Sequence, residues 1–484
     1  MHPAIGGIDA AILVAYLAVA VALGVWIGRR KQDLAGYLLG GRSIPWPGLL
    51  LSIVATETST VTFLSIPGVA FAANGSLVFL QLTFGYMIGR LLIVVLLLPA
   101  YFQGKPFTAY EVLHRRFGGA VGPTASVLFL VTRNLADGLR LYLTAIVMQL
   151  TLGVDLWLCI VVIGVTTIVY TFLGGLKSVV WNDCLQFVVY MVGAVLAAGV
   201  IVQMLPGGWE QLWQFGAEHG KFHLFDLSLD VRQPYTLWAG LVGGVFLSLG
   251  THGADQLMVQ RYLAARSRRD AAWALALSGP IVCGQFALFL LLGVGLACFY
   301  AAHPPAVPFA ADDWVFARFI VDHLPTGVLG ITLAAVFSAA MSTLSSSLNS
   351  SATAAMNDLY RPVVGNRASP AQLLGVSRAL TVLFGLVQIG IALAGSHCQL
   401  QRSVVESVLA IAGFTGGPIL GVFFLGIATR RVDRRGALAG LAGGIAVVTV
   451  VALGTDVAWP WFAVVGAGST VAIGWVAPRS RHYS

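Results

Sequence analysis

Residues 338–360, SAAMSTLSSSLNSSATAAMNDLY, place a run of serine and threonine inside a stretch apolar enough to cross a membrane. Clustered hydroxyl and carbonyl oxygens without His or Cys suit a hard cation, and in hydrocarbon such groups need partners from protein, water or an ion. Helices that pack closely through small hydroxyl residues produce the same pattern, so that interpretation stays open. At about 100° per residue, one helix face carries Ala339, Ser342, Thr343, Ser345, Ser346, Asn349, Ser350 and Thr353.

Composition assigns the chain to the polytopic helical membrane proteins. Hydrophobic residues make up 58% of the 484 residues and charged residues only 10%, and the mean hydropathy is +0.85. These values exclude a soluble fold. About 13 stretches are long enough to span a bilayer, given about 20 apolar residues per span. They lie near residues 9–28, 45–72, 75–102, 120–151, 155–175, 178–204, 235–256, 272–301, 324–357, 372–395, 403–428, 436–453 and 458–477.

The distribution of Lys and Arg predicts the orientation in the membrane. Most basic residues fall in loops that follow odd-numbered spans, including Arg29, Lys177 and Arg261, and cytoplasmic loops carry such an excess. We therefore expect the N-terminus outside and the C-terminus in the cytoplasm, in a plasma membrane of bacterial inner-membrane type. Topology accounts for the net charge of +8, so no nucleic-acid partner is expected.

Two predicted spans are interrupted at corresponding places. Residues 45–72 open with prolines and carry the polar core ATETST around Glu57, whereas residues 238–256 are broken by glycines and end in a polar run. Discontinuous helices at matching positions of two halves indicate a transporter site between inverted repeats. We expect a single all-α domain of 1–484, with an extra helix and loop at 7–44, repeats at 45–204 and 235–428, and two final helices at 436–477.

Five segments resemble the sodium:solute symporter family, in that family's order: GRSIPWPGLLLSIVATETS (41–59), TAYEVLHRRFG (108–118), GGLKSVVWNDCLQF (174–187), DQLMVQRYLAARS (255–267) and MSTLSSSLNSSATAAMNDLY (341–360). The resemblance covers roughly residues 7–450. It implies a leucine-transporter-like 5+5 inverted repeat and symport of a small organic solute with sodium by alternating access.

The resemblance also implies ion-binding residues. The family's shared Na⁺ site matches the carbonyls of Ala55, Thr58 and Ala339 and the hydroxyls of Ser342 and Thr343. A second Na⁺ site of some members matches Asp183, Ser342, Ser345 and Ser346, which suggests two ions per solute. A carboxylate in mid-span needs a cation or hydrogen-bond donors nearby, although a structural bond from Asn182 or a neighbouring helix would also satisfy Asp183. No organic cofactor is expected.

The solute is less well defined. In TRNLADGLRLY, Asp137 lies within one helical turn of both Arg133 and Arg140, which predicts one surplus positive charge and a carboxylate-bearing solute, unless the three form a structural ion cluster. The other candidate solute contacts are the polar residues Glu57, Thr62, Gln81, Ser248 and Thr251. Glu57 could instead tune the sodium site or carry a proton. Val282 stands where sugar-transporting members place a lysine, which disfavours a sugar.

Three functions are consistent with these residues: a sodium-coupled symporter, a proton-coupled carrier that uses Glu57 or Asp183, and a symporter-like sensor. The symporter is favoured, because the chain ends about seven residues after its last span and leaves no room for an output domain. Enzyme motifs such as a Walker motif, G-x-S-x-G and H-E-x-x-H are absent, so we expect a secondary transporter and not an enzyme. We expect the lipid bilayer and the solute as its partners, and no obligatory protein partner.

Overall fold

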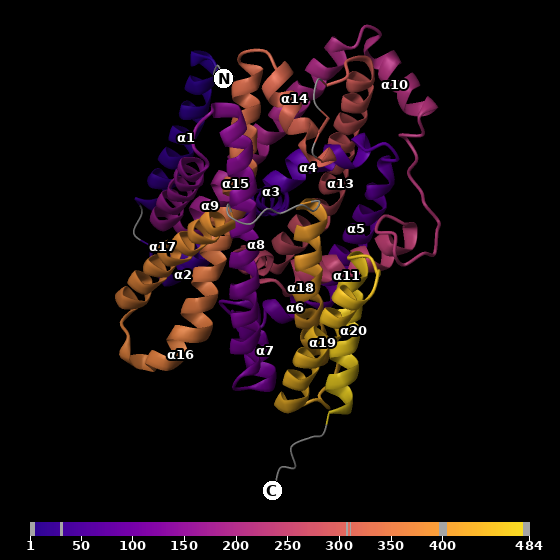
Figure 1. Cartoon of the computed structure of the whole chain (residues 1–484). Helices are drawn as coiled ribbons and strands as arrows, with labels where there is room; N and C mark the ends of the chain where they lie inside the picture. Colours follow the sequence, from indigo (N-terminus) through magenta and orange to yellow (C-terminus); the bar gives the residue numbers. More distant parts are fainter. Residues whose placement is uncertain (1–4, 30–31, 306–307, 310, 396–403, 478–484) are drawn as a thin grey trace, which may run out of the picture.

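The computed structural model describes residues 5–29, 32–305, 308–309, 311–395 and 404–477. Within these ranges the chain is a helical bundle in which α1 begins at the top of Figure 1 and α20 ends at the bottom. The first part contains α1 (Gly7–Gly28), α2 (Leu34–Leu39), η1 (Gly40–Arg42), α3 (Trp46–Glu57), α4 (Thr60–Phe71), η2 (Leu77–Phe79), α5 (Leu80–Leu96), α6 (Leu98–Tyr101), α7 (Ala109–Phe117), α8 (Val121–Leu152), α9 (Leu156–Met204) and α10 (Gly208–Glu218). The second contains η3 (Ala239–Gly243), α11 (Gly244–Ser248), η4 (Leu249–Ala254), α12 (Gln256–Leu263), α13 (Arg268–Ala302), η5 (Asp312–Trp314), α14 (Val315–His323), α15 (Val328–Ala354), η6 (Ala355–Tyr360), α16 (Arg361–Val364), η7 (Gly365–Arg367), α17 (Pro370–Gly395), α18 (Val404–Ala428), α19 (Arg434–Gly454) and α20 (Pro460–Val476).

Helices occupy each of the 13 predicted spans. By length and apolar composition, 8 helices of the described residues can cross a membrane, or 9 when the bent pair α3 and α4 is taken as one span. The remaining four arise in three ways. The 49-residue α9 changes direction at Gly175 and covers two predicted spans, α8 carries charged residues in its middle, and the helices of 239–254 and 460–476 are short.

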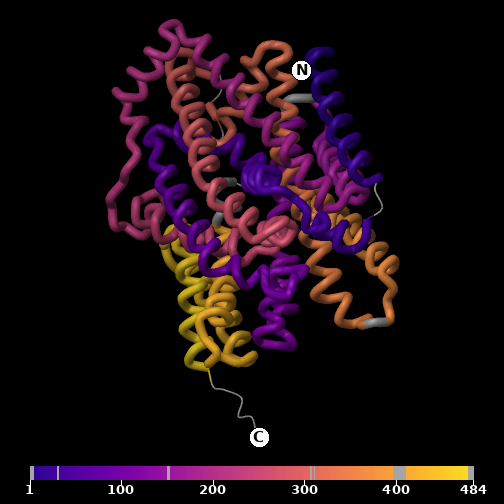
Figure 2. The backbone as a smooth tube through the Cα atoms, turned by 180° about the vertical axis from the view of Figure 1, so that it is seen from behind, coloured from indigo at the N-terminus to yellow at the C-terminus, as the bar shows by residue number. Residues whose placement is uncertain are grey.

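The serine-rich helix α15 lies at the centre of the bundle. It packs against α9 and also contacts α1, α8, α17 and α3, as the crossing helices in Figures 1 and 2 show. Every residue from Thr332 to Ala354 is buried. Hydroxyl side chains on all sides of α15 therefore face protein, which forces each of them to find a partner or a ligand.

The first predicted interruption is confirmed, whereas the second span stays helical through Ala254 and leaves helical geometry only at Asp255. The first span bends by 62° between α3 and α4, because Thr58 leaves helical geometry and Ser59 caps the N-terminus of α4. The second widens into the π-helical turns η3 and η4 and ends at Asp255, whose extended backbone starts α12. Helix ends at mid-bundle expose backbone carbonyls that a continuous helix would have satisfied internally.

The outer end of α4 is held by a buried lysine from the loop after α10. The Lys221 ammonium donates to the carbonyl oxygens of Ala70 (3.2 Å), Phe71 (3.3 Å) and Ala72 (2.5 Å), which end the helix. A cation is favourable there because a helix C-terminus carries partial negative charge. Burial lowers the pKa of the Lys221 amine.

The direction change in α9 depends on one glycine. Gly175 has φ 57° and ψ −159°, a region that is nearly exclusive to glycine, and an added Cβ would collide with the backbone of Tyr37. We expect Gly175→Ala to lower the free energy of unfolding by about 1–3 kcal/mol or more, as measured by denaturation in detergent. Gly199→Ala is the matched control, since Gly199 lies on the same helix and its added Cβ would meet nothing within 4 Å. Equal stability of the two variants would contradict a strained kink.

Candidate functional site

Two hydroxyls of α15 meet the carbonyls that the break of the first span leaves free. Ser342 Oγ lies 2.9 Å from the carbonyl oxygen of Ala55, to which it donates, and 3.1 Å from that of Ala339. Thr343 Oγ1 lies 3.2 Å from the carbonyl oxygen of Thr56 and 3.4 Å from that of Ala339. The two hydroxyl oxygens and the three carbonyl oxygens make five oxygens in all. Each hydroxyl has one proton, so only two hydrogen-bond donors are available to these five oxygens. This surplus of lone pairs is the chemistry of a hard-cation site.

Four of the five residues matched to the shared sodium site are thus brought together. The fifth, Thr58, begins the non-helical turn, where its side chain donates to the carbonyl oxygen of Val54 (2.9 Å) and accepts from Gln285 (2.5 Å). The described hydrogen bonds link Thr343 to the carbonyl of Thr56 and not to that of Thr58. Thr56 is therefore an additional oxygen ligand candidate.

Asp183 lies at the centre of a second buried cluster. Its Oδ2 accepts from Ser52 (2.5 Å), Thr56 (3.3 Å) and the guanidinium of Arg261 (3.1 Å). Arg261 also donates to Ser346 and so joins α12 to α3, α9 and α15. Asp183 Oδ1 is buried and has no hydrogen-bond partner among the described residues.

Arg261 lies on a buried helix and not in an exposed loop. The predicted span ends at residue 256, which would put Arg261 in the loop that follows it. The side chain is instead fully buried, because α12 turns back into the bundle and carries its charge to Asp183. Of the residues matched to the second sodium site, Ser346 contacts this network directly, whereas Ser342 and Ser345 bond to backbone carbonyls.

Glu57 belongs to a third cluster, at the bend between α3 and α4. Its carboxylate pairs with Arg90 of α5 and lies 3.4 Å from Nε2 of His252 in η4. Arg90 is fully buried and also donates to Ser278 Oγ (2.8 Å). His252 Nδ1 lies 3.0 Å from the hydroxyl of Thr251, which connects this cluster to the neighbouring pocket.

The charged residues of α8 form the fourth cluster. The prediction that one positive charge of this cluster lacks a carboxylate is wrong. Asp137 pairs with Arg140 and lies 3.8 Å from Arg133, as the spacing allows, but Arg133 also pairs with Asp255 at the start of α12. Two arginines therefore face two aspartates. The sequence could not assign Asp255, since this residue is 122 positions away from Arg133.

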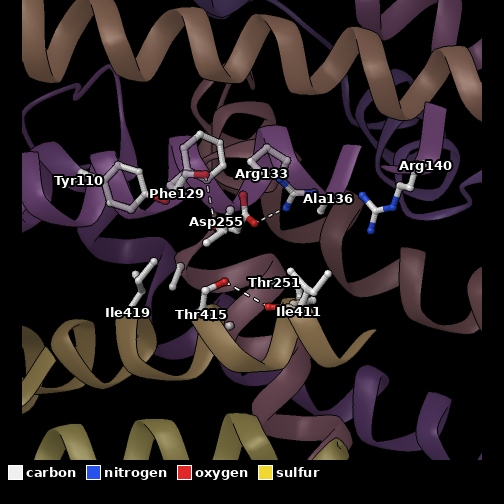
Figure 3. A pocket seen from close by; sticks show the side chains of 15 residues that line it. Tyr110, Phe129, Arg133, Ala136, Arg140, Thr251, Asp255, Ile411, Thr415 and Ile419 are labelled. Atoms are coloured by element: carbon white, nitrogen blue, oxygen red, sulfur yellow. Dashed lines mark hydrogen bonds and ion pairs between the residues drawn. The ribbon is translucent and has the colours of Figure 1, made fainter. Parts of the chain in front are cut away.

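A small pocket opens beside this cluster, between α8, η4 and α18. Arg133, Arg140 and Thr251 line it together with Phe129 and Thr415, and its volume is about 40 Å³. Figure 3 shows Arg133 reaching Asp255, while the guanidinium of Arg140 lies beyond Ala136. Nε of Arg140 is buried without a hydrogen-bond partner among the described residues. A solute larger than a water molecule would require these helices to move apart.

The other solute candidates do not line this pocket. Gln81 donates to the carbonyls of Val78 and Tyr235 and accepts from the amide of Asp226, so its amide is used structurally. Ser248 donates to the carbonyl of Tyr86 (3.3 Å), and the Thr62 amide bonds to Ser59.

The remaining polar side chains of α15 support close helix packing, the alternative that the sequence left open. Gln260 of α12 donates to Asn349 and Thr353 at 2.7 Å each. Gln388 of α17 donates to Ser347 at 2.9 Å. The helix α15 therefore contributes both to a candidate ion site, near Ser342, and to close helix packing, through hydrogen bonds nearer its C-terminus.

Arg90 and Arg261 are site residues that were not among the predicted ones. Arg90 was recognisable, since an arginine inside an apolar run requires a partner. Arg261 carried no such signal, because it belongs to a basic segment that continues with Arg266, Arg268 and Arg269.

Comparisons with known proteins identify the family of this chain. A model described as the sodium:solute symporter family matches residues 37–444. The chain is 31% identical over 469 residues to the human sodium/iodide cotransporter (94% of this chain, 71% of the relative), and 29% identical over 486 residues to the sodium/sialic acid symporter NanT of Aliivibrio fischeri (99% and 94%). It is also similar to the substrate-bound, outward-open structure of a Na⁺-coupled sialic acid symporter, with TM-score 0.88, 27% identity and 97% of each chain covered.

Proposed function

This chain belongs to the sodium:solute symporter family, and from that premise we propose that it imports a small carboxylate-bearing organic solute together with sodium. It is an integral membrane protein with the leucine-transporter-like fold, and it works as a sodium-coupled symporter by alternating access. The proposal concerns which residues bind the ions and which class of solute is carried.

We assign one sodium ion to the five oxygens at the break of the first span. The contact of Ser342 and Thr343 with carbonyls of α3 is the observation that carries this assignment, since it joins the central helix to the bend. The ion would be held by the carbonyls of Ala55, Ala339 and Thr58 or Thr56 and by the two hydroxyls. Because these oxygens belong to α3 and α15, the bound ion would fix the position of the bend relative to the central helix.

We assign a second sodium ion to the free side of Asp183. Arg261 donates to Oδ2 of Asp183, while Oδ1 is buried without a partner among the described residues. The hydroxyl of Ser346 contacts the same guanidinium, and Ser342 and Ser345 of α15 would supply the other hydroxyls. Each sodium that moves down a potential of 100 mV releases about 2.3 kcal/mol, and a tenfold solute gradient stores about 1.4 kcal/mol. Two sodium ions could thus drive roughly thousandfold accumulation of a neutral solute, and an anion would benefit less from the potential.

The carboxylate assignment depends on Arg140. Its guanidinium lines the pocket, and Nε lacks a partner among the described residues, so one donor is available to a ligand even though the cluster is electrically balanced. A planar guanidinium suits a carboxylate. Iodide and sialic acid, named for the two relatives, are both anions.

The orientation and the membrane are part of the proposal. The excess of Lys and Arg supports an outside N-terminus and a cytoplasmic C-terminus in a bacterial inner membrane. Residues 478–484, at the proposed cytoplasmic end, lie outside the described residues.

The test is the thermal unfolding midpoint of purified protein in sodium or choline, with carboxylates, amino acids, sugars, polyols and vitamins added. Ligands that bind the folded state raise the midpoint by mass action. We expect sodium to raise it and a carboxylate to raise it further. Arg140→Gln should abolish the carboxylate shift and keep the sodium shift, and Arg140→Lys should restore part of the former, since it keeps the charge without the planar fork.

Two results would overturn parts of this proposal. A neutral solute whose shift survives in Arg140→Gln would exclude the carboxylate assignment. A solute shift that is independent of sodium but changes with pH would indicate proton coupling, with Glu57 as the first candidate.

A further inference from the structure

A hollow of about 820 Å³ lies away from the candidate sodium and solute sites, between the end of α1, the α2–η1 turn and α9 just after its change of direction. These three elements are adjacent in Figure 1, and α1 and α2 both pack against α9. None of the residues assigned above to ion or solute binding lines it. The hollow is therefore separate from the proposed sodium and solute sites.

One wall of the hollow is apolar and contains exposed tryptophan. It is built by Leu23, Trp26 and Ile27 of α1 and by Trp181 of α9. Trp26 is 65% exposed, and Trp181 and the nearby Trp46 are each 38% exposed. Exposed tryptophans concentrate where hydrocarbon meets headgroups, so one side of the hollow faces lipid chains and the other faces the interface.

The polar end carries two unpaired cations. Within the described residues, the side chains of Arg29 and Lys177 make no hydrogen bond or ion pair, although both line the hollow. Gln32 donates to the carbonyl of Gly174 (3.2 Å), and its Oε1 is buried without a partner in the same part of the structure. Asp33 also lines the hollow, but its Oδ1 caps α2 through the amide of Gly36 (2.7 Å). The lining thus has two positive charges and one negative charge.

We propose that this hollow binds an anionic phospholipid. The phosphate would lie between Arg29 and Lys177, and the acyl chains would lie along Leu23, Trp26 and Trp181. A free phosphate would match the basic end but leave the apolar wall without a partner, and a zwitterionic lipid would leave the net positive charge uncompensated. The bound lipid would join α1, which lies outside the proposed repeats, to α9 beside Gly175.

Native mass spectrometry of the full chain, with added phosphatidylglycerol or phosphatidylcholine, tests the proposal. We expect the wild type to retain phosphatidylglycerol preferentially. Arg29→Gln combined with Lys177→Gln should reduce its affinity by about 20- to 30-fold, since each basic residue near an anionic surface contributes about fivefold. The matched control is Arg430→Gln combined with Arg435→Gln, which removes two exposed charges, one just before α19 and one from its first turn.

Three outcomes would overturn the proposal: equal retention of both lipids by the wild type, equal loss in both double variants, or tight binding of glycerol phosphate without acyl chains. The sodium-dependent thermal shift, which uses none of these residues, verifies that each variant is folded. A lost lipid preference with an intact sodium shift would support the proposal without reference to the transported solute.

Discussion

Ser342→Ala and Thr343→Ala are each expected to raise the sodium concentration for half-maximal uptake by about 10- to 100-fold, with a smaller effect on the maximal rate in saturating sodium. Each change removes one of two hydroxyls that touch the carbonyls of the broken helix. A hydrogen bond or ligand to a charged group contributes about 1.5–3 kcal/mol, which corresponds to such a change in affinity. Solute uptake by proteoliposomes at varied external sodium, with choline as replacement, measures it.

Ser350→Ala is the matched control. Ser350 is buried on the same helix, but within the described part of the chain its hydroxyl bonds only to the carbonyl of Ser347 in that helix (3.1 Å). Its sodium dependence should equal that of the wild type. If all three variants shift alike, the effect would reflect the packing of α15, and the ion would have to be placed elsewhere.

Replacement of either member of the Asp183–Arg261 pair should be strongly destabilising. Both side chains are fully buried, and removal of one partner leaves an uncompensated charge, which costs about 3–5 kcal/mol. We therefore expect Arg261→Gln to lose about this much free energy of unfolding, as measured by denaturant titration in detergent. The double variant Asp183→Asn with Arg261→Gln should lose less than Arg261→Gln alone, since no unpaired charge remains.

Asp183→Asn should also lower the number of sodium ions moved per solute from two to one, as measured by parallel fluxes of labelled sodium and solute. An unchanged ratio would place any second ion away from Asp183.

The surface pair Arg318–Asp322, with side chains 55% and 38% exposed, provides the control for the stability measurement on Arg261→Gln. Arg318→Gln should cost less than about 1 kcal/mol, because solvent screens exposed pairs.

The two broken helices were predictable because each depends on local sequence. The polar ATETST core interrupts the first span at Thr58 and Ser59, and closely spaced glycines accompany the π-helical turns of the second. The position of the hydroxyl face on α15 was predictable for the same reason, since helical periodicity fixes which residues are neighbours. The choice between ion site and packing surface was not, because both use the same residue types.

Charge pairing was the part that local sequence did not reveal. In α8, the spacing of three and four residues allowed Asp137 to pair with either arginine and left one positive charge over. The structure pairs Asp137 with Arg140 and, at 3.8 Å, with Arg133, and it supplies a second carboxylate for Arg133 from Asp255, which follows the second broken helix. Glu57 was recognised as unusual, but its partner Arg90 lies on a different helix, and only the packing of α5 against η4 brings His252 to the same place.

By itself the sequence determined that this protein is a helical membrane transporter with two discontinuous helices around a serine-rich central helix. Hydropathy, helical period and helix-breaking residues act over a few helical turns, so they can be recognised directly in the amino-acid sequence. The tertiary structure alone decided that Arg261 enters the core to meet Asp183, 78 residues away, and that Arg140 reaches a pocket between three elements. Such contacts join distant segments, and their geometry exists only after the helices have packed.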